Sequence, residues 1–208
     1  MILRRYWYDI GAFVAAAALI YVAACWREMN RSSLLLLLNF VALLLHQFEE
    51  YGWPGGEPSI LNIVMRPSER PDRFPLNQNS AMIINVLAAY GFYLVPVFFP
   101  RIYWLGIAPT LFGFGQFLIH GIAVPKKLGS FYNPGLAAVV LLHIPIGIAY
   151  LVHISQDVKA MDWIAGVVYC VAFVYTTLAK MTYTWLASLD SSYPFAEEEM
   201  ERFKSWKR

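Results

Sequence analysis

The sequence predicts an all-α fold, a polytopic membrane bundle of about six transmembrane helices. Of its 208 residues, 59% are hydrophobic and only 14% are charged, compared with about 25% charged residues in an ordinary soluble domain. Six stretches also reach the roughly 20 apolar residues that a helix needs to cross a bilayer. The net charge of +2, with basic residues scattered along the chain, gives no reason to expect a nucleic-acid partner.

The predicted spans are residues 10–26, 34–51, 80–99, 102–124, 134–154 and 162–186. The first follows Arg4 and Arg5, as in a signal peptide, but no small-residue cleavage pattern precedes Trp26. We therefore interpret it as a retained anchor. Polar or proline-containing segments separate the spans, and the spans with their connections form one predicted domain, residues 1–188.

Two segments outside the spans are notable. The connection 52–79 is long and holds five prolines and three glycines, a composition that opposes regular helix and favours an extended, lid-like segment. The chain ends in a charged tail, residues 189–208, in which acidic residues precede basic ones. That order suits an amphipathic surface helix at the cytoplasmic face, and a solvated tail is an equally good interpretation.

The distribution of basic residues predicts the orientation. Six spans place both ends of the chain on one side of the membrane. The opposite side holds only four of the sixteen basic residues, and Lys180 falls inside the sixth span. By the positive-inside rule, both termini and the connection 52–79 face the cytoplasm of a multi-pass protein surrounded by membrane lipids. The eleven basic residues on the terminal side are Arg4, Arg5, Arg66, Arg70, Arg73, Lys126, Lys127, Arg202, Lys204, Lys207 and Arg208.

The most informative motif is His46-Gln47-Phe48-Glu49-Glu50, at the end of the second predicted span. At about 100° per residue, the imidazole and both carboxylates share one helix face. Two ionised carboxylates in a layer of low dielectric constant repel each other. A bound cation, a basic partner such as Lys180, or protonation relieves the repulsion, and a divalent metal would satisfy both carboxylates at once.

Other polar residues are predicted at the same depth, where each needs a partner or a cavity. Gln116 and His120 come late in the fourth span, and Lys180 comes late in the sixth. Asn85 and Asn133 stand near the starts of the third and fifth spans. We expect four of them to support the site around its ligands: Asn85, Gln116, Asn133 and Lys180. His143 lies about 14 Å into the fifth span, where it would form the floor of a cavity and could join the ligands.

The ligand types are imidazole and carboxylate, which suit zinc first, with iron or manganese as alternatives. The two cysteines, Cys25 and Cys170, lie inside apolar stretches without CxxC spacing, so we expect them in the core. The alternative to a metal is a structural network in which Glu49 or Glu50 bonds to Lys180 and the histidines bond across helices.

Three motifs together resemble a known family. They are His46-Gln47-Phe48-Glu49-Glu50-Tyr51, a later histidine in Gln116-Phe117-Leu118-Ile119-His120, and Tyr132-Asn133-Pro134-Gly135. The chain resembles, over roughly residues 34–150, the HXXEE family of uncharacterised bacterial and archaeal integral membrane proteins. That family commonly has an asparagine four residues before the later histidine, where this chain keeps an amide in Gln116. The resemblance implies His46, Glu49, Glu50 and His120 as the functional set and a bacterial or archaeal cytoplasmic membrane as the location.

The function expected first is that of a membrane-embedded, metal-dependent enzyme, most simply a hydrolase acting on a small lipid-like substrate at the cytoplasmic side. His46, His120 and one of Glu49 or Glu50 would hold the metal, and the other glutamate would be the catalytic base. The alternatives are a proton- or metal-ion-coupled transporter and a non-catalytic protein whose polar layer only holds the helices together.

Overall fold

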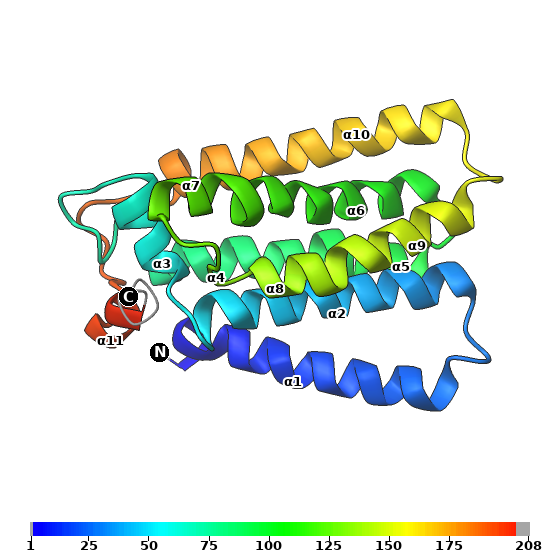
Figure 1. The fold of residues 1–208 in the computed structure, drawn as a ribbon, viewed down its shortest axis with the longest axis horizontal. Helices are drawn as coiled ribbons and strands as arrows, with labels where there is room; N and C mark the ends of the chain where they lie inside the picture. Colours follow the sequence, from blue (N-terminus) through cyan, green and yellow to red (C-terminus); the bar gives the residue numbers. More distant parts are fainter. Residues whose placement is uncertain (1, 203–208) are drawn as a thin grey trace.

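The computed structural model describes residues 2–202 and is helical, without a β-strand in that range (Figure 1). Six helices are long and apolar enough to cross a membrane, which confirms the predicted fold class. They are Leu3–Cys25, Arg31–Tyr51, Gln78–Phe98, Tyr103–Leu128, Leu136–Ile154 and Ala160–Trp185. Both ends of the described chain lie at the same end of the bundle, called the terminal end below. Its assignment to the cytoplasm stays a prediction.

The first two spans are the α-helices α1 (Ile2–Cys25) and α2 (Arg31–Tyr51), and the other four contain π-helical stretches, labelled η. The third span consists of α4 (Gln78–Val86), η2 (Leu87–Tyr93) and α5 (Val95–Phe98), and the fourth of α6 (Tyr103–Phe117), η3 (Leu118–Ala123) and α7 (Val124–Leu128). The fifth consists of α8 (Leu136–Ala138), η4 (Val139–His143) and α9 (Ile144–Ile154), and the sixth of α10 (Ala160–Val174) and η5 (Tyr175–Trp185).

Three of the π-helical stretches end shortly before a proline. They are η2 before Pro96, η3 before Pro125 and η4 before Pro145. Proline donates no backbone hydrogen bond, and its ring clashes with the carbonyl four residues earlier. Local π-helical turns are one way in which membrane helices accommodate this. The third, fourth and fifth spans therefore cross the bundle with a change of helical pitch.

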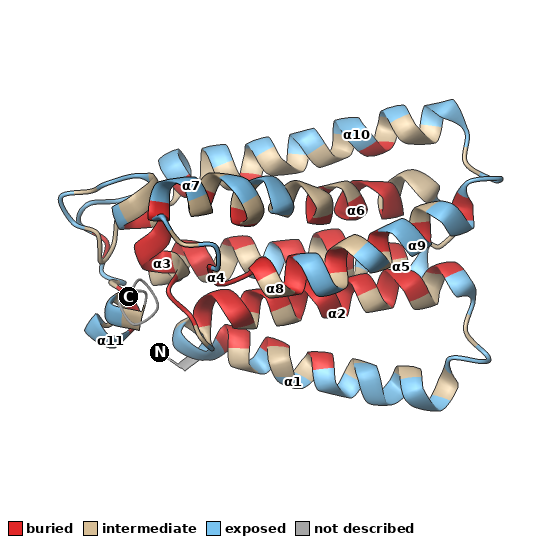
Figure 2. Cartoon of the chain, in the orientation of Figure 1, coloured by how far each residue is buried: buried red, intermediate tan, exposed pale blue. Residues whose placement is uncertain are grey.

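The helix α2 forms the centre of the bundle. Over its most apolar stretch, 67% of the residues are buried, compared with 17% in α1 and in the sixth span, as Figure 2 shows. The run of leucines in α2 is apolar on all sides, which suits a helix surrounded by others. The outer helices instead expose large apolar side chains such as Phe13, Ile20 and Val171, as expected of helices that face lipid.

The start of the first span differs from the prediction. The helix begins at Ile2 rather than at residue 10, so that it includes Arg4 and Arg5. Both charges have partners. The Nε of Arg4 donates to Oδ1 of Asn79 over 2.8 Å, and Arg5 forms an ion pair with Glu198. These contacts satisfy the guanidinium groups in a short helical piece that joins the rest of α1 across a kink at Tyr6, where φ is −124° and ψ is 15°.

The connection 52–79 is also different from the prediction, because part of it is helical. It contains α3 (Glu57–Ser59) and η1 (Ile60–Met65). Pro58 stands in the first turn of α3, where a helix needs no amide donor. The buried Asn62 then fixes the remainder, since its Nδ2 donates to the carbonyls of Pro71 and Leu76 over 2.7 and 2.8 Å. The connection that was expected to be extended is thus helical over residues 57–65, because local geometry and the bonds of Asn62 outweigh the proline content there.

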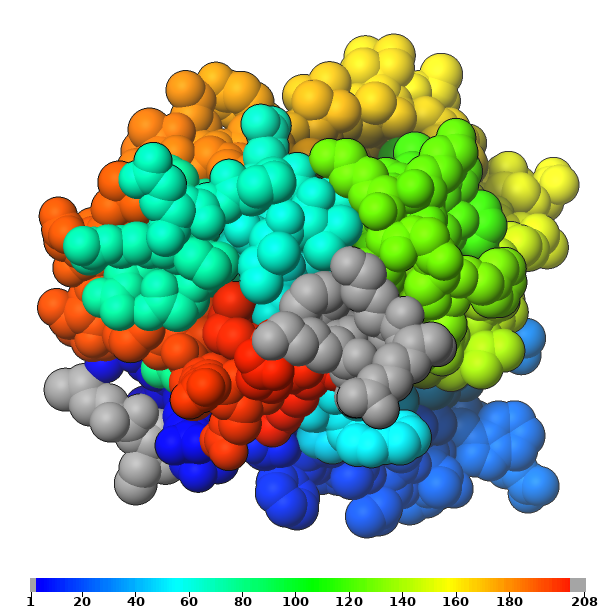
Figure 3. Space-filling model, turned by 60° about the vertical axis from the view of Figure 1, so that its left-hand side comes forward, coloured from blue at the N-terminus to red at the C-terminus, as the bar shows by residue number. Residues whose placement is uncertain are grey.

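The described part of the predicted tail packs against this connection. It contains the short helix α11 (Glu197–Glu201). Ser59 Oγ donates to the carbonyl of Met200 over 2.7 Å, and Arg202 donates to the carbonyls of Tyr51 and Gly52 over 2.8 and 2.7 Å. Figure 3 shows the connection, in cyan and teal, between the sixth span and α7. The basic residues predicted at the end of the tail, Lys204, Lys207 and Arg208, lie outside the described residues.

Candidate metal centre

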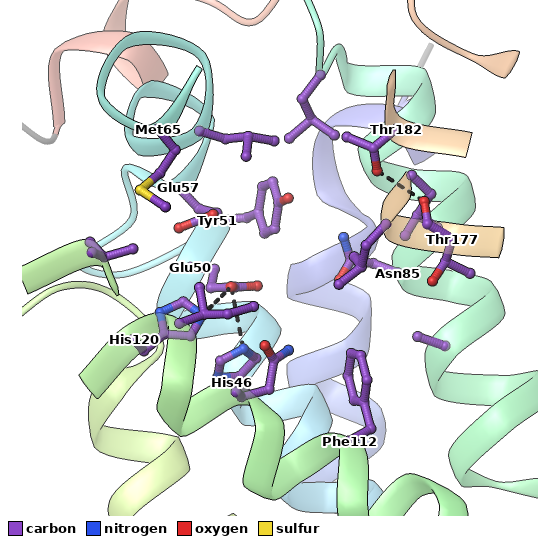
Figure 4. Close-up of a pocket in the computed structure, with 18 of the residues that line it drawn as sticks. His46, Glu50, Tyr51, Glu57, Met65, Asn85, Phe112, His120, Thr177 and Thr182 are labelled. Atoms are coloured by element: carbon purple, nitrogen blue, oxygen red, sulfur yellow. Dashed lines mark hydrogen bonds and ion pairs between the residues drawn. The ribbon is translucent and has the colours of Figure 1, made fainter. Parts of the chain in front are cut away.

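His46, Glu50 and His120 form a buried cluster near the terminal end of the bundle (Figure 4). His46 and Glu50 stand one turn apart on α2, and η3 supplies His120. The Oε1 atom of Glu50 lies 3.3 Å from Nε2 of each histidine. One ligand atom from each residue lies within 4.8 Å of the other two, so the group can hold a metal ion.

Hydrogen bonds on the far side of each imidazole fix its tautomer. Nδ1 of His46 lies 3.0 Å from the backbone carbonyl of Gly135, which can only accept a hydrogen bond. Nδ1 of His120 lies 2.8 Å from Oδ1 of Asn133, whose Nδ2 donates to the carbonyl of His120 over 2.6 Å. Each Nδ1 is therefore a donor, and in the neutral imidazole this leaves Nε2 with a lone pair that faces Glu50. Metal-binding histidines are commonly held in this way.

Gly135 allows the two imidazoles to approach the start of α8. Its φ is +96°, a conformation that residues with a side chain rarely adopt. A Cβ at this position would also lie 2.7 Å from Cε1 of His46 and 2.8 Å from Cε1 of His120. Glycine is required here both by the backbone and by the packing of the two histidines.

Glu49 points away from the cluster although it is adjacent to Glu50. Its carboxylate accepts hydrogen bonds from the hydroxyl of Tyr132 over 2.8 Å and from the amides of Ala137 and Ala138 over 3.1 and 2.8 Å. It therefore caps the first turn of the fifth span, where a negative charge is favourable. Burial raises the pKa of Tyr132, and the Glu49 charge adds to this effect, so the hydroxyl remains a donor.

Hydrogen bonds thus connect the Tyr-Asn-Pro-Gly motif to the HxxEE motif and to His120. Tyr132 donates to Glu49, Asn133 accepts from His120 and Gly135 accepts from His46. Asn133, predicted to support the site, lies directly behind His120. These bonds join the second, fourth and fifth spans around the cluster.

His143 lies deeper in the bundle, as predicted, and is not within the group of three ligand atoms. Its ring centroid lies 5.8 Å from that of His46. Its Nδ1 is hydrogen-bonded to Oδ1 of Asn39 in α2 across 3.0 Å. Nε2 of His143 is buried and has no hydrogen-bond partner among the described residues.

Beside the cluster is a cavity of about 480 Å³. Figure 4 shows His46, Glu50 and His120 on one side of it and Thr177 and Thr182 of η5 on the other. Asn85 and Gln116 also line it, in agreement with their predicted depth. Apolar residues from α2, η2, α6 and the sixth span make up much of its wall, including Leu43, Ala88, Phe112, Phe173 and Leu178.

Lys180 does not take part in the site. Its Nζ lies 5.5 Å from the centre of the Tyr175 ring, and the residue is not among those that line the cavity. No ion pair joins it to Glu49 or Glu50 in the described structure. The sequence placed Lys180 at the right depth, but its position on η5 directs it away from the two glutamates.

Glu57 is a cavity residue that the sequence analysis missed. It lines the cavity from α3, and its Oε2 is buried without a hydrogen-bond partner among the described residues. Burial, with a further contribution from the charge of Glu50, raises the pKa of Glu57 to about 8. The available signal was an acidic residue between two glycines and a proline, which is too common in loops to identify a site.

Comparison with known protein families shows to which family the chain is related. A family model described as "protein of unknown function with HXXEE motif" matches residues 37–150, more than half of the chain. The chain belongs to the HXXEE family. Comparisons with curated proteins and with solved structures find no match. In this HXXEE protein the matched region holds all three residues of the cluster, Gly135 and Glu57. Among the residues that line the cavity, only those of α10 and η5 lie beyond it.

Proposed function

We propose that this HXXEE protein is a membrane-embedded, metal-dependent enzyme, with the metal held by Nε2 of His46, Nε2 of His120 and the carboxylate of Glu50. The observation that carries the proposal is the 3.3 Å distance from Glu50 Oε1 to both Nε2 atoms. Ligand atoms each about 2.1 Å from a tetrahedral zinc ion lie about 3.4 Å apart. The two fixed tautomers support the same arrangement.

The donor set limits the choice of metal. Two imidazoles and one carboxylate suit zinc, and they also suit the iron(II) and manganese sites of other enzymes. Three protein ligands leave a position for water, and a metal held there would lower the pKa of that water toward 7. We propose zinc as the metal, with hydrolysis of a lipid-like ester, amide or phosphoester as the reaction.

Two glutamates have separate roles in this proposal. Glu49 holds the fifth span in place and so positions the loop that supports both histidines. We assign the catalytic base to Glu57, since this carboxyl group faces the cavity and has a buried oxygen without a partner. A base must be able to exchange a proton near the working pH. Asn85 and Gln116 offer amide groups along the same cavity, where they would orient the substrate.

Metal analysis tests the proposal. The protein is purified in a mild detergent without added metal, and bound elements are measured by mass spectrometry before and after incubation with zinc, manganese or iron(II). We expect about one metal ion per chain in the wild type, and its loss in folded His46→Ala, Glu50→Ala and His120→Ala variants.

His153→Ala is the matched control, because His153 is an exposed histidine in α9 at the opposite end of the fifth span. It should keep the metal. A well-folded wild type that binds none of the three metals would overturn the proposal.

A proton-coupled transporter is the second candidate, and one observation favours it. Buried polar groups continue from the cluster toward the middle of the bundle through His143 and Asn39 to Tyr93. Asn39 Nδ2, His143 Nε2 and the Tyr93 hydroxyl all lack hydrogen-bond partners among the described residues. Proton flux into liposomes that is lost in His143→Phe, without loss of metal, would favour transport over hydrolysis.

A further inference from the structure

The cavity has basic residues at its rim. Arg66, which follows η1, and Lys127 in α7 both line it at the terminal end and are exposed. The guanidinium of Arg66 lies 5.3 Å from the centre of the Tyr183 ring, and Nζ of Lys127 donates to the carbonyl of Met65 over 3.1 Å. Neither cation forms an ion pair with a carboxylate in the described part of the chain.

Three other arginines at this end do form ion pairs with carboxylates. Arg5 pairs with Glu198, Arg70 with Asp190 and Arg73 with Asp72. Lys126 is exposed but does not line the cavity. A general excess of basic residues on one side of a membrane explains Lys126, but it does not explain why two cations without carboxylate partners converge on the rim of the cavity.

The remainder of the wall is suited to a hydrocarbon chain. Leu43, Ala88, Phe112, Phe173 and Leu178 present apolar side chains to the cavity, and the polar cluster of His46, Glu50 and His120 also lines it. A volume of about 480 Å³ lies within the range of small-molecule sites. The same cavity therefore offers apolar contacts, a candidate metal centre and two cations.

We propose that the cavity binds an amphiphile with one hydrocarbon chain and an anionic, phosphate-bearing headgroup. The chain contacts the apolar wall, and the headgroup contacts Arg66 and Lys127, which donate charge-assisted hydrogen bonds to phosphate oxygens. What happens to the bound molecule rests on the proposed function, whereas the binding itself does not require a metal.

Binding measurements with three probes test this inference. They are a lysophosphatidic acid, the uncharged monoacylglycerol with the same chain, and glycerol phosphate as the headgroup alone. Native mass spectrometry of the protein in an uncharged detergent gives the affinity and the number bound. We expect one lysophosphatidic acid per chain, bound at least tenfold more tightly than the monoacylglycerol, and no measurable binding of glycerol phosphate.

The two positive charges are then removed together in the double variant Arg66→Gln, Lys127→Gln. The affinity for lysophosphatidic acid should fall at least tenfold, to that of the monoacylglycerol. The control, Lys126→Gln with Arg31→Gln, removes the same charge at two exposed residues that do not line the cavity. An equal loss in the control, or equal binding of the charged and uncharged lipids, would overturn the inference, and tight binding of glycerol phosphate would assign a free-phosphate site instead.

Metal binding and lipid binding, measured side by side on the wild-type protein, separate this inference from the proposed function. Preference for the anionic lipid without metal binding in any form of the protein supports the inference and overturns the enzyme proposal. Metal binding by the wild type without a preference for the anionic lipid supports the metal site of the proposed enzyme and overturns the lipid inference.

Discussion

The carboxylate of Glu49 accepts a 2.8 Å hydrogen bond from the hydroxyl of Tyr132, a residue that follows it by 83 positions. This bond, with those to the amides of Ala137 and Ala138, separates the role of Glu49 from that of Glu50. Glu49 faces the N-terminal turn of the fifth span, and Glu50 faces His46 and His120.

Glutamine substitutions should distinguish the two residues. Glu50→Gln removes a charged ligand, and we expect at least 100-fold weaker metal binding with the fold retained. Glu49→Gln weakens the cap, at a cost of about 1–2 kcal/mol of stability, and should change metal affinity less than tenfold. Thermal unfolding and metal titration of both variants check this. The reverse pattern would place the ligand role on Glu49.

Gly135→Ala should weaken both folding and metal binding. The new methyl group would meet both imidazoles, and the positive φ adds strain of about 1–3 kcal/mol. The control is Gly129→Ala, since Gly129 has a similar φ of +70° but no atom within 4 Å of an added Cβ. Metal affinity should fall only in the first variant. Equal effects of both substitutions on metal binding would contradict the role assigned to Gly135.

Asn133→Leu should lower metal affinity by about 10–100-fold, the usual effect of removing a hydrogen-bond partner behind a histidine ligand. The substitution leaves Nδ1 of His120 without its acceptor and so no longer fixes the tautomer. The control is Asn85→Leu, because Asn85 lines the cavity but bonds to the carbonyl of Ala81 rather than to a histidine. Metal titration should show little change in that control.

The stability of the metal-free protein should fall as the pH rises from about 5 to about 8. Glu57 has an ordinary pKa of 4.5, which the folded structure raises to about 8. Between these values the folded protein binds the proton more tightly than the unfolded chain does, so each increase in pH favours unfolding. The integrated effect is at most a few kcal/mol. Glu57→Gln should remove it, as followed by thermal unfolding at a series of pH values.

Glu69→Gln is the control for this pH series, because Glu69 is an exposed carboxylate in the same connection. It should leave the slope unchanged. A slope that is the same in Glu57→Gln as in the wild type would contradict the raised pKa of Glu57.

Hydropathy and length predicted the six spans because burial in lipid requires about 20 apolar residues, whatever the details of packing. Counting residues from the ends of the spans also predicted that His46, Glu50 and His120 share a layer. Depth alone does not give the rotation of a helix, which depends on its neighbours. For this reason the sequence grouped Lys180 with the site, although it lies beside Tyr175. Glu49 was grouped with the site by its helix face, but adjacent residues lie about 100° apart around a helix, so Glu49 meets the fifth span while Glu50 meets the histidines.

The sequence did not predict Glu57 as a cavity residue, for a different reason. Its position depends on contacts between distant segments, such as the bond from Ser59 to the carbonyl of Met200 and the bonds of Asn62. No periodicity in the sequence encodes such contacts. The composition of the connection indicated only a loop.

The contact of Arg202 with the carbonyls of Tyr51 and Gly52 sets an order of events during synthesis. All six spans leave the ribosome before Arg202 does, so its bonds to the end of α2 and to the first residue of the connection form only after the spans have been synthesised. The contact between the tail and the connection is therefore the last of these to form. A tag fused after Arg202 belongs on a long linker, so that its bulk does not compete with the bonds of Arg202 to Tyr51 and Gly52.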